Sequence, residues 1–225
     1  MINYLTVTMS ARKVLIMEPS DCAFLGISHI LRDVLGLNPD HVPDCPNALK
    51  QIRDALKKSA PYDLLITEFS GTERGNETRE LIKEATGIQP ALRTLLYTSE
   101  VRPLALKAIL REPGVNGYVL KNGHGSSQVV KAIRNIGKSG FYLSPEVDEL
   151  INQVHHISLE GYDFRILTAL AEGYSQREIA QLFNYHKIHP SSLSSIEKRI
   201  NQLKDRFQAK NNVHLIAKAN ILGAL

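Results

Sequence analysis

The chain is poor in cysteine and has no long apolar run, and each absence excludes a class of protein. Its 225 residues include only two cysteines, Cys22 and Cys45, so no disulfide framework is expected. No apolar run approaches the roughly 20 residues that cross a bilayer. The first eleven residues lack the charged start and the longer apolar run of a secretory signal. We therefore expect a cytoplasmic protein with no membrane partner.

The patterns that would indicate a metal or a cofactor are incomplete. The loop at 71–75 contains two glycines but lacks the Lys-Ser/Thr pair of a phosphate-binding loop. The histidines at 155–156, and those at 186 and 189, lack further ligands at metal-binding spacing. We therefore expect no metal, no cofactor and no enzymatic activity.

Length and composition are compatible with two compact domains. A chain of 225 residues can form two domains that each bury a core. The hydrophobic fraction of 43% and the charged fraction of 22% are those of an ordinary globular protein. The formal net charge of +4 permits nucleic-acid binding without requiring it.

The segment 1–138 is expected to form an α/β domain, because short apolar runs alternate with helical patterns from residue 12 onward. Five strands alternating with five helices favour a flavodoxin-like, five-stranded parallel sheet with helices on both faces. The expected strands lie at 12–17, 41–45, 62–68, 93–98 and 117–120. The expected helices lie at 24–35, 46–59, 77–86, 103–111 and 129–136.

Polar side chains stand at the carboxyl ends of four of these strands. Glu18 follows the first strand, and Glu68 ends the third. Thr98 ends the fourth, and Lys121 follows the fifth. Right-handed crossovers bring the carboxyl ends of parallel strands to one edge, where open α/β sheets place their sites. We therefore expect these four residues to form one site.

The sequences around these positions resemble the receiver domains of two-component response regulators. The resemblance covers most of 12–138 and implies a phosphoryl-accepting aspartate, two acids that hold Mg²⁺, and a Thr and a Lys that bind the phosphoryl oxygens. It also implies an aromatic residue that reports the state of the switch. Thr98, Lys121 and Tyr118 match that pattern. The matching segments are VLIMEPS (14–20), DLLITEFS (63–70), LLYTSE (95–100) and GYVLKN (117–122).

Two departures remove the chemistry that this family uses. Glu68 stands at the acceptor position, and its side chain is one methylene longer than that of aspartate. In-line phosphoryl transfer tolerates little misplacement of the acceptor. Pro19 follows Glu18, so the second acid is missing, and Mg²⁺ requires near-ideal octahedral oxygen ligands. We expect a degenerate receiver that is not phosphorylated. A conventional phosphoacceptor is the alternative that these departures oppose.

The remaining acid and lysine leave several interpretations open. Glu68 and Lys121 can form a structural ion pair that ties two strand ends together. A glutamate that reaches toward Lys121 and Thr98 can also imitate the phosphorylated state and hold the domain switched. Alternatively, the site is inert. Tyr118 likewise has a plain interpretation as a packed strand residue.

The segment 158–225 is helical in pattern and follows a Gly-, Ser- and Pro-containing linker at 139–157. The first helix carries an apolar stripe, and Gly173 is expected to end this helix. The sequence at 175–178 is a capping box that opens a second helix, and Pro190 is expected at the first position of a third. The stripe is Phe164, Leu167, Leu170 and Ala171, and the last helix carries Val213, Ile216 and Leu222.

This half resembles the helix-turn-helix module of LuxR/NarL (FixJ-type) regulators, and the order of both halves is most similar to RcsB-like members. The resemblance implies a DNA-binding domain whose third helix enters the major groove. The turn at 184–190 is about three residues longer than the family pattern. The matching segments are LTALAEGYSQREIAQLF (167–183), IHPSSLSSIEKRI (188–200) and VHLIAKANILGAL (213–225).

Charge distribution supports a DNA-contacting surface on and around the third helix. The segment 187–210 holds six basic and two acidic residues, a net charge of +4. On the outward face of the third helix, small hydroxyl residues and a lysine are suited to contacts with DNA bases. The other basic residues of the segment are suited to contacts with backbone phosphates. The alternative is that these basic residues form a solvent-exposed helix face that contacts no DNA. The candidate residues are Lys187, Ser191, Ser192, Ser194, Ser195, Lys198, Arg199, Lys204, Arg206 and Lys210.

The sequence therefore predicts a transcription regulator that binds double-stranded DNA as a homodimer or as a heterodimer with a related regulator. The alternative is an auxiliary protein that acts by heterodimerisation and binds DNA poorly alone.

Overall fold

The computed structural model describes residues 13–69, 73–122 and 124–225. The chain forms two compact units. The first is built on a sheet and comprises the residues up to Val101 and Leu106–Glu149, and the second is helical and comprises Arg102–Ala105 and Leu150–Leu225. The chain passes for the last time from the first unit to the second at Glu149–Leu150. That point falls inside the segment predicted as the linker. No helix within the described ranges is both long and apolar enough to cross a bilayer.

The first unit contains a parallel sheet of six strands, not the five that the sequence predicts. The sixth strand comes from the predicted linker, where Tyr142 pairs with Gly117 and the N–H of Ser144 donates to the carbonyl of Tyr118 at 3.0 Å. Two residues are too few to show an alternating pattern, which is why the sequence does not indicate this strand. The strand order is β2-β1-β3-β4-β5-β6. The strands are β1 (Val14–Met17), β2 (Asp40–Val42), β3 (Leu64–Thr67), β4 (Arg93–Thr98), β5 (Val115–Leu120) and β6 (Tyr142–Leu143).

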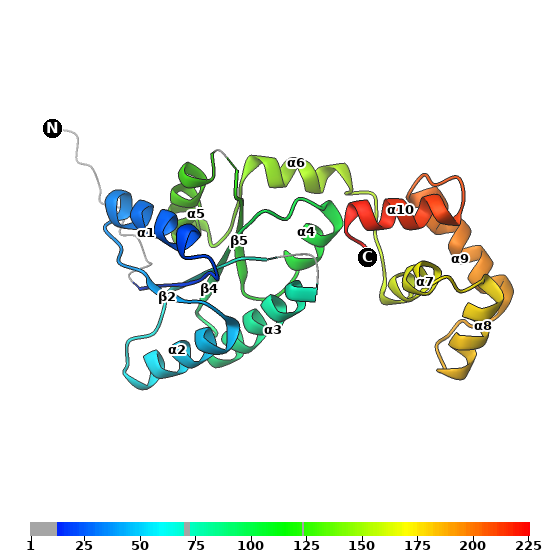
Figure 1. The fold of residues 1–225 in the computed structure, drawn as a ribbon, viewed down its shortest axis with the longest axis horizontal. Helices are drawn as coiled ribbons and strands as arrows, with labels where there is room; N and C mark the ends of the chain where they lie inside the picture. Colours follow the sequence, from blue (N-terminus) through cyan, green and yellow to red (C-terminus); the bar gives the residue numbers. More distant parts are fainter. Residues whose placement is uncertain (1–12, 70–72, 123) are drawn as a thin grey trace. The chain divides into compact units, whose positions relative to one another are not determined.

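Helices cover both faces of this sheet, as Figure 1 shows. One face packs against α1 and α5, and the other packs against α2 and α3. Central strands β1 and β3 are buried on both sides, so they appear in the sequence as continuous apolar runs. The helices of this unit are α1 (Asp21–Leu35), α2 (Cys45–Lys57), α3 (Glu73–Ile88) and α5 (Gly125–Ser139). Helices α4 (Pro103–Ile109) and α6 (Pro145–Gln153) each have residues in both units.

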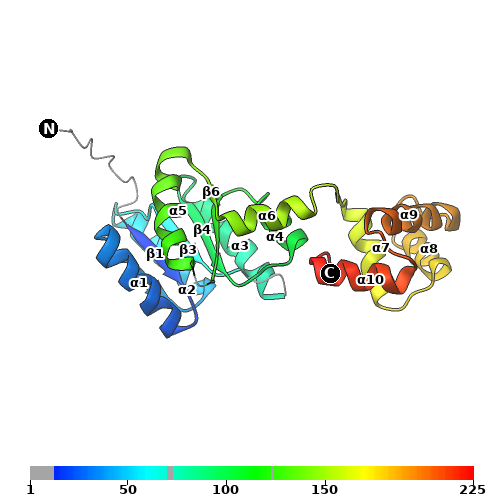
Figure 2. The same ribbon diagram turned by 90° about the horizontal axis from the view of Figure 1, so that it is seen from above.

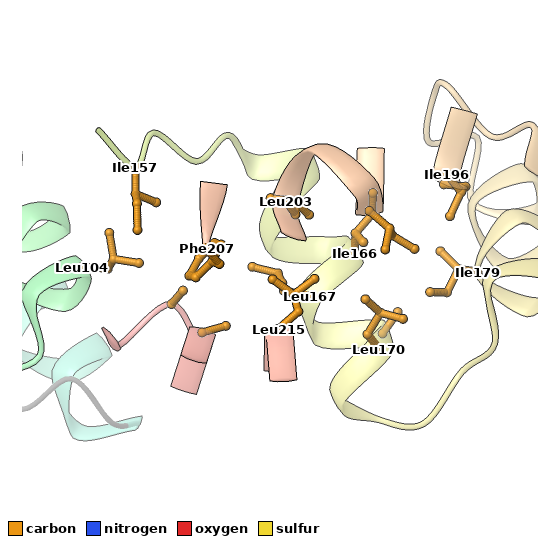
Figure 3. Packing of buried hydrophobic residues seen from close by; sticks show 14 of the residues in the cluster. Leu104, Ile157, Ile166, Leu167, Leu170, Ile179, Ile196, Leu203, Phe207 and Leu215 are labelled. Atoms are coloured by element: carbon orange, nitrogen blue, oxygen red, sulfur yellow. The ribbon is translucent and has the colours of Figure 1, made fainter. Parts of the chain in front are cut away.

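The second unit is a group of four helices around one apolar core (Figure 2). Side chains from all four helices point toward one another, among them Ile166, Ile179, Ile196 and Leu215 (Figure 3). The helices are α7 (Gly161–Ala171), α8 (Gln176–Tyr185), α9 (Leu193–Arg206) and α10 (Asn212–Leu222).

Two details of this unit differ from the sequence prediction. Helix α9 begins at Leu193 with Ser192 as its N-cap, so Pro190 lies before the helix and not at its first position. Ser192 accepts a hydrogen bond from the N–H of Ser195 at 3.2 Å, which makes it the stronger helix start. On α7, Phe164 is 39% exposed and Ala171 is exposed, whereas Leu167 and Leu170 are buried as predicted.

Candidate regulatory site and nucleic-acid interface

An ion-paired cluster occupies the carboxyl edge of the sheet. The Lys121 Nζ atom lies 2.8 Å from Oε2 of Glu18 and 3.1 Å from Oε2 of Glu68. Only 4% of the Glu18 side chain and 20% of the Lys121 side chain are exposed, against 34% for Glu68. The other carboxylate oxygen of Glu18 accepts the N–H of Ser20 at 3.0 Å. The prediction that Glu68 and Lys121 form an ion pair is confirmed, and Glu18 joins the pair.

The two carboxylates keep the lysine charged. Burial lowers the pKa of Lys121, but the hydrogen bonds and charges of Glu18 and Glu68 outweigh it, so the net pKa is raised. The ammonium group also lies 5.5 Å from the ring centroid of Tyr97, a cation–π distance. The lysine therefore acts as a permanent counter-ion for both acids.

The residues that remain do not fit the Mg²⁺ site that the receiver resemblance implies. Pro19 offers no oxygen ligand from its side chain, and the carboxylates of Glu18 and Glu68 are both bound to the Lys121 ammonium. Among the residues that the structure describes, no cluster of three His, Cys, Asp or Glu side chains could hold a metal ion. A cation that used these two acids would first have to displace the lysine.

Thr98 and Tyr118 connect the loops beside this cluster. The Thr98 hydroxyl donates to the carbonyl of Phe69 and accepts the N–H of Glu100, the latter at 3.1 Å. Tyr118 is fully buried, and its hydroxyl donates to the carbonyl of Glu100 at 3.2 Å. Burial raises the pKa of Tyr118, so the hydroxyl stays protonated as a donor. The loops that follow β3 and β4 are thus joined through side chains that the sequence predicts as site residues.

A capping box positions α8, as the sequence predicts. The Ser175 hydroxyl accepts the N–H of Glu178 at 3.3 Å, and the Glu178 carboxylate accepts the N–H of Ser175 at 2.8 Å. Hydrogen bonds from Ser175 hold the pKa of Glu178 below its usual value. This reciprocal pair satisfies two N–H groups at the helix start and fixes where the turn-helix arrangement begins.

The predicted DNA-facing residues divide by their exposure. Helix α9 turns Ile196, Ile200 and Leu203 into the core, so its opposite face meets solvent. Lys187, Ser192, Ser194, Lys198 and Lys210 are exposed, and Ser191, Ser195 and Lys204 are half-buried.

Two predicted DNA contacts are engaged inside the domain instead. Arg199 holds Asp163 of α7 through two bonds, Nε to Oδ1 at 2.5 Å and an Nη atom to Oδ2 at 2.9 Å. Arg206 donates to the carbonyl of Ser158 at 2.7 Å and lies 3.6 Å from Asp163. Only 20% of the Arg199 side chain is exposed. The sequence predicts both arginines as DNA contacts, whereas in the structure their guanidinium groups are engaged with Asp163 of the same domain.

Asp163 is the residue that the sequence prediction missed. It is completely buried, and hydrogen bonding to it raises the pKa of Arg199. Its carboxylate also accepts the N–H of Glu160 at 2.9 Å, which caps α7. The sequence carried a signal: Asp163 precedes Ile166, Leu167 and Leu170 at helical spacing, so it lies on the apolar face. An acid on that face needs a cation from another element.

The chain is similar in sequence to one characterised protein. No protein-family model matches the chain. The response regulator GacA of Pseudomonas aeruginosa is 26% identical over 185 residues, which cover 80% of this chain and 79% of GacA. The chain is therefore similar in sequence to a response regulator.

Solved structures show the same fold. A structure of two RcsB dimers bound to two parallel DNAs matches with a TM-score of 0.65 and 23% identity, over 94% of this chain and 99% of that one. A LuxR-family two-component response regulator from Aurantimonas sp. SI85-9A1 matches with a TM-score of 0.55 and 18% identity, over 65% of this chain and 99% of that one. In fold, the chain is thus similar to these proteins, with an α/β unit followed by a helical unit.

Proposed function

We propose that the chain is a DNA-binding transcription regulator whose receiver-like domain works without phosphorylation. The observation that carries this proposal is the position of Lys121, whose ammonium group bridges Glu18 and Glu68 at 2.8 and 3.1 Å. The ammonium group that the receiver resemblance assigns to the phosphoryl oxygens is already bound to two carboxylates of the chain.

The contacts around this cluster favour a domain held in one state. Lys121 joins the ends of β1, β3 and β5 through its ion pairs, and its own N–H donates to the carbonyl of Thr98 at 2.7 Å. The side chains of Thr98 and Tyr118 then fix the loops after β3 and β4. We infer that the site is a permanent lock, not an inert remnant, because every one of these polar groups has a partner.

The helical unit supports DNA binding through the exposed face of α9. Ser194 and Lys198 lie on that face, and small hydroxyl residues let a helix lie deep in the major groove. Lys187 and Lys210 flank the helix and suit phosphate contacts. Arg199 and Arg206 orient α9 on α7 through Asp163 and are not assigned to DNA. RcsB, which has a similar fold, has been solved bound to DNA.

We also propose a dimer, with α10 as a contact surface. Val213 and Ile221 are 77% and 71% exposed, and together with the exposed Ala217 they form one stripe at a spacing of four. Ile216 and Leu222, which the sequence placed on this stripe, pack against the core instead. An apolar stripe left open on a helix is suited to a second helix of the same kind.

The second candidate is an auxiliary protein that acts in a heterodimer and binds DNA poorly alone. The long turn at 184–190 favours it, because an altered helix-turn-helix can lose affinity for a target. Two experiments separate the proposed regulator from the auxiliary protein. The first maps bound DNA across the genome, and the second titrates mapped and scrambled duplexes with the purified chain. The proposal requires tighter binding to mapped duplexes by the chain alone. Binding that appears only with a related regulator present would favour the second candidate.

A further inference from the structure

A small cavity opens at the amino edge of the sheet in the first unit, at the other ends of the strands from the Lys121 cluster. Its volume is about 140 Å³. Residues of α5, of the starts of β3 and β4, and of the turn before β4 line it. None of the lining residues belongs to the Lys121 cluster, so this cavity is separate from the site at the carboxyl edge.

The floor of the cavity is apolar. Leu64, Ile133 and Ile136 line it, and all three are buried in the core between the sheet and α5. Pockets for cofactors and drug-sized ligands measure roughly 300–1,000 Å³, so this cavity is too small for them. An apolar cavity of about 150 Å³ holds a benzene ring. The volume therefore suits an apolar group of about four to six carbons.

Two lining positions carry almost no side chain. Gly137 lies in the last turn of α5, and the exposed Ala91 lies in the turn that precedes β4. Glycine makes a helix less stable than alanine does, because it loses more conformational freedom on folding. Helix formation therefore does not explain Gly137, whereas its place in the wall of the cavity does, since a larger residue would reduce the open volume.

Two groups of opposite charge lie at the mouth of the cavity. Asp63 precedes β3 and Arg93 begins β4, and the N–H of Arg93 donates to the carbonyl of Asp63 at 3.3 Å. The Asp63 carboxylate accepts the N–H of Lys13 at 2.9 Å, and an Nη atom of Arg93 donates to the carbonyl of Ile136 at 2.8 Å. These bonds position both side chains. A carboxylate accepts several hydrogen bonds and a guanidinium donates several, so each can bind a ligand in addition to these partners.

An apolar floor beside a carboxylate and a guanidinium matches one class of small molecule. A ligand that carried only an acid would meet the charge of Asp63, and one that carried only an amine would meet that of Arg93. We propose that this cavity binds an apolar amino acid of leucine size in its zwitterionic form. The ligand carboxylate binds the guanidinium, the ammonium group binds the Asp63 carboxylate, and the side chain packs on the floor. This inference does not depend on DNA binding, because every lining residue belongs to the first unit.

The test is isothermal titration calorimetry of the full chain with L-leucine, isocaproate and isoamylamine as probes. Isocaproate has the apolar group and the carboxylate of leucine without the ammonium group, and isoamylamine has the ammonium group without the carboxylate. We expect saturable one-to-one binding of L-leucine. Each analogue should bind at least about tenfold more weakly, because it loses a charge-assisted hydrogen bond. L-Alanine should also bind more weakly, because it leaves the floor unfilled. Equal affinity for all three probes would overturn the proposal.

Two variants and one control locate the binding. Ala91→Trp places a large ring at the mouth of the cavity and should abolish binding of L-leucine. Ala60→Trp introduces the same ring at an exposed alanine between α2 and β3 that does not line the cavity, and it should leave the affinity unchanged. Arg93→Gln should weaken L-leucine at least about tenfold and leave isoamylamine unaffected, a difference that unfolding would not produce.

Two results would contradict the site. If the unsubstituted chain binds no L-leucine, the cavity does not take this class of ligand. If binding survives Ala91→Trp and Arg93→Gln unchanged, L-leucine binds elsewhere on the chain.

Discussion

Replacing Lys121 by Met should destabilise the first unit by more than the loss of a surface ion pair. The substitution keeps most of the aliphatic stem and removes the charge that lies 2.8 Å from Glu18 and 3.1 Å from Glu68. Glu18 is left buried without a counter-ion, while Glu68, whose side chain is 34% exposed, can turn toward water. Removing one partner of a buried ion pair lowers the free energy of unfolding by roughly 3–5 kcal/mol. Because Glu68 can reach water, we expect a loss at the lower end, about 3 kcal/mol.

The assay is urea unfolding of the purified chain near neutral pH, with the free energy of unfolding compared between variants. The pKa of Lys121 is raised in the folded chain, so its stabilising contribution is complete at neutral pH. It should be lost only as the pH rises through the raised value. The double variant Lys121→Met with Glu18→Gln removes both buried charges and should recover most of the lost stability.

Two outcomes would refute this reasoning. A loss below about 1 kcal/mol for Lys121→Met would mean that the cluster is no stronger than an exposed ion pair. A double variant that is less stable than Lys121→Met would mean that the Glu18 carboxylate needs no counter-ion. In either case, the lysine is not the element that locks the carboxyl edge of the sheet.

Three further predictions follow from the two units. Treatment with a small phosphodonor and Mg²⁺ should add no phosphoryl group to Glu68, and mass spectrometry of the intact chain checks this. Lys198→Ala should weaken specific duplexes more than scrambled ones, by about 1–3 kcal/mol, whereas Lys210→Ala should weaken both alike and lower the salt slope by about one. Arg199→Ala should lower the free energy of unfolding by about 3 kcal/mol, because the buried Asp163 loses its two closest ionic contacts and keeps only the more distant Arg206 as a counter-ion; a change below about 1 kcal/mol would contradict the buried pair.

The sequence predicts the sheet well because its strands are buried on both faces. Continuous apolar runs such as 14–17 and 64–66 favour a central strand, and the expected strands contain or overlap β1 to β5. The same parallel arrangement brings Glu18, Glu68 and Lys121 together, so their meeting follows from topology alone. Strand β6 escapes the prediction because two residues carry no pattern.

The sequence does not predict the role of a side chain whose contacts lie on a distant helix. Arg199 looks like a free basic residue in the sequence, and its position on Asp163 depends on how α9 packs against α7. The start of α9 depends on which residue caps it. Ser192 is the N-cap because its hydroxyl accepts the N–H of Ser195, so Pro190 lies before the helix. On α10, apolar residues are spread around the helix, so their spacing does not separate the exposed Val213 from the buried Leu215.

The central claim is that this chain binds DNA without phosphorylation of its receiver-like domain. Its most direct test is the affinity of the purified chain for a mapped target duplex, measured with and without a small phosphodonor and Mg²⁺. Saturable binding that favours the mapped duplex over a scrambled one, with the same affinity under both conditions, is the predicted result. Binding that strengthens severalfold with the phosphodonor, and reverts when Glu68→Gln is tested, would contradict the account.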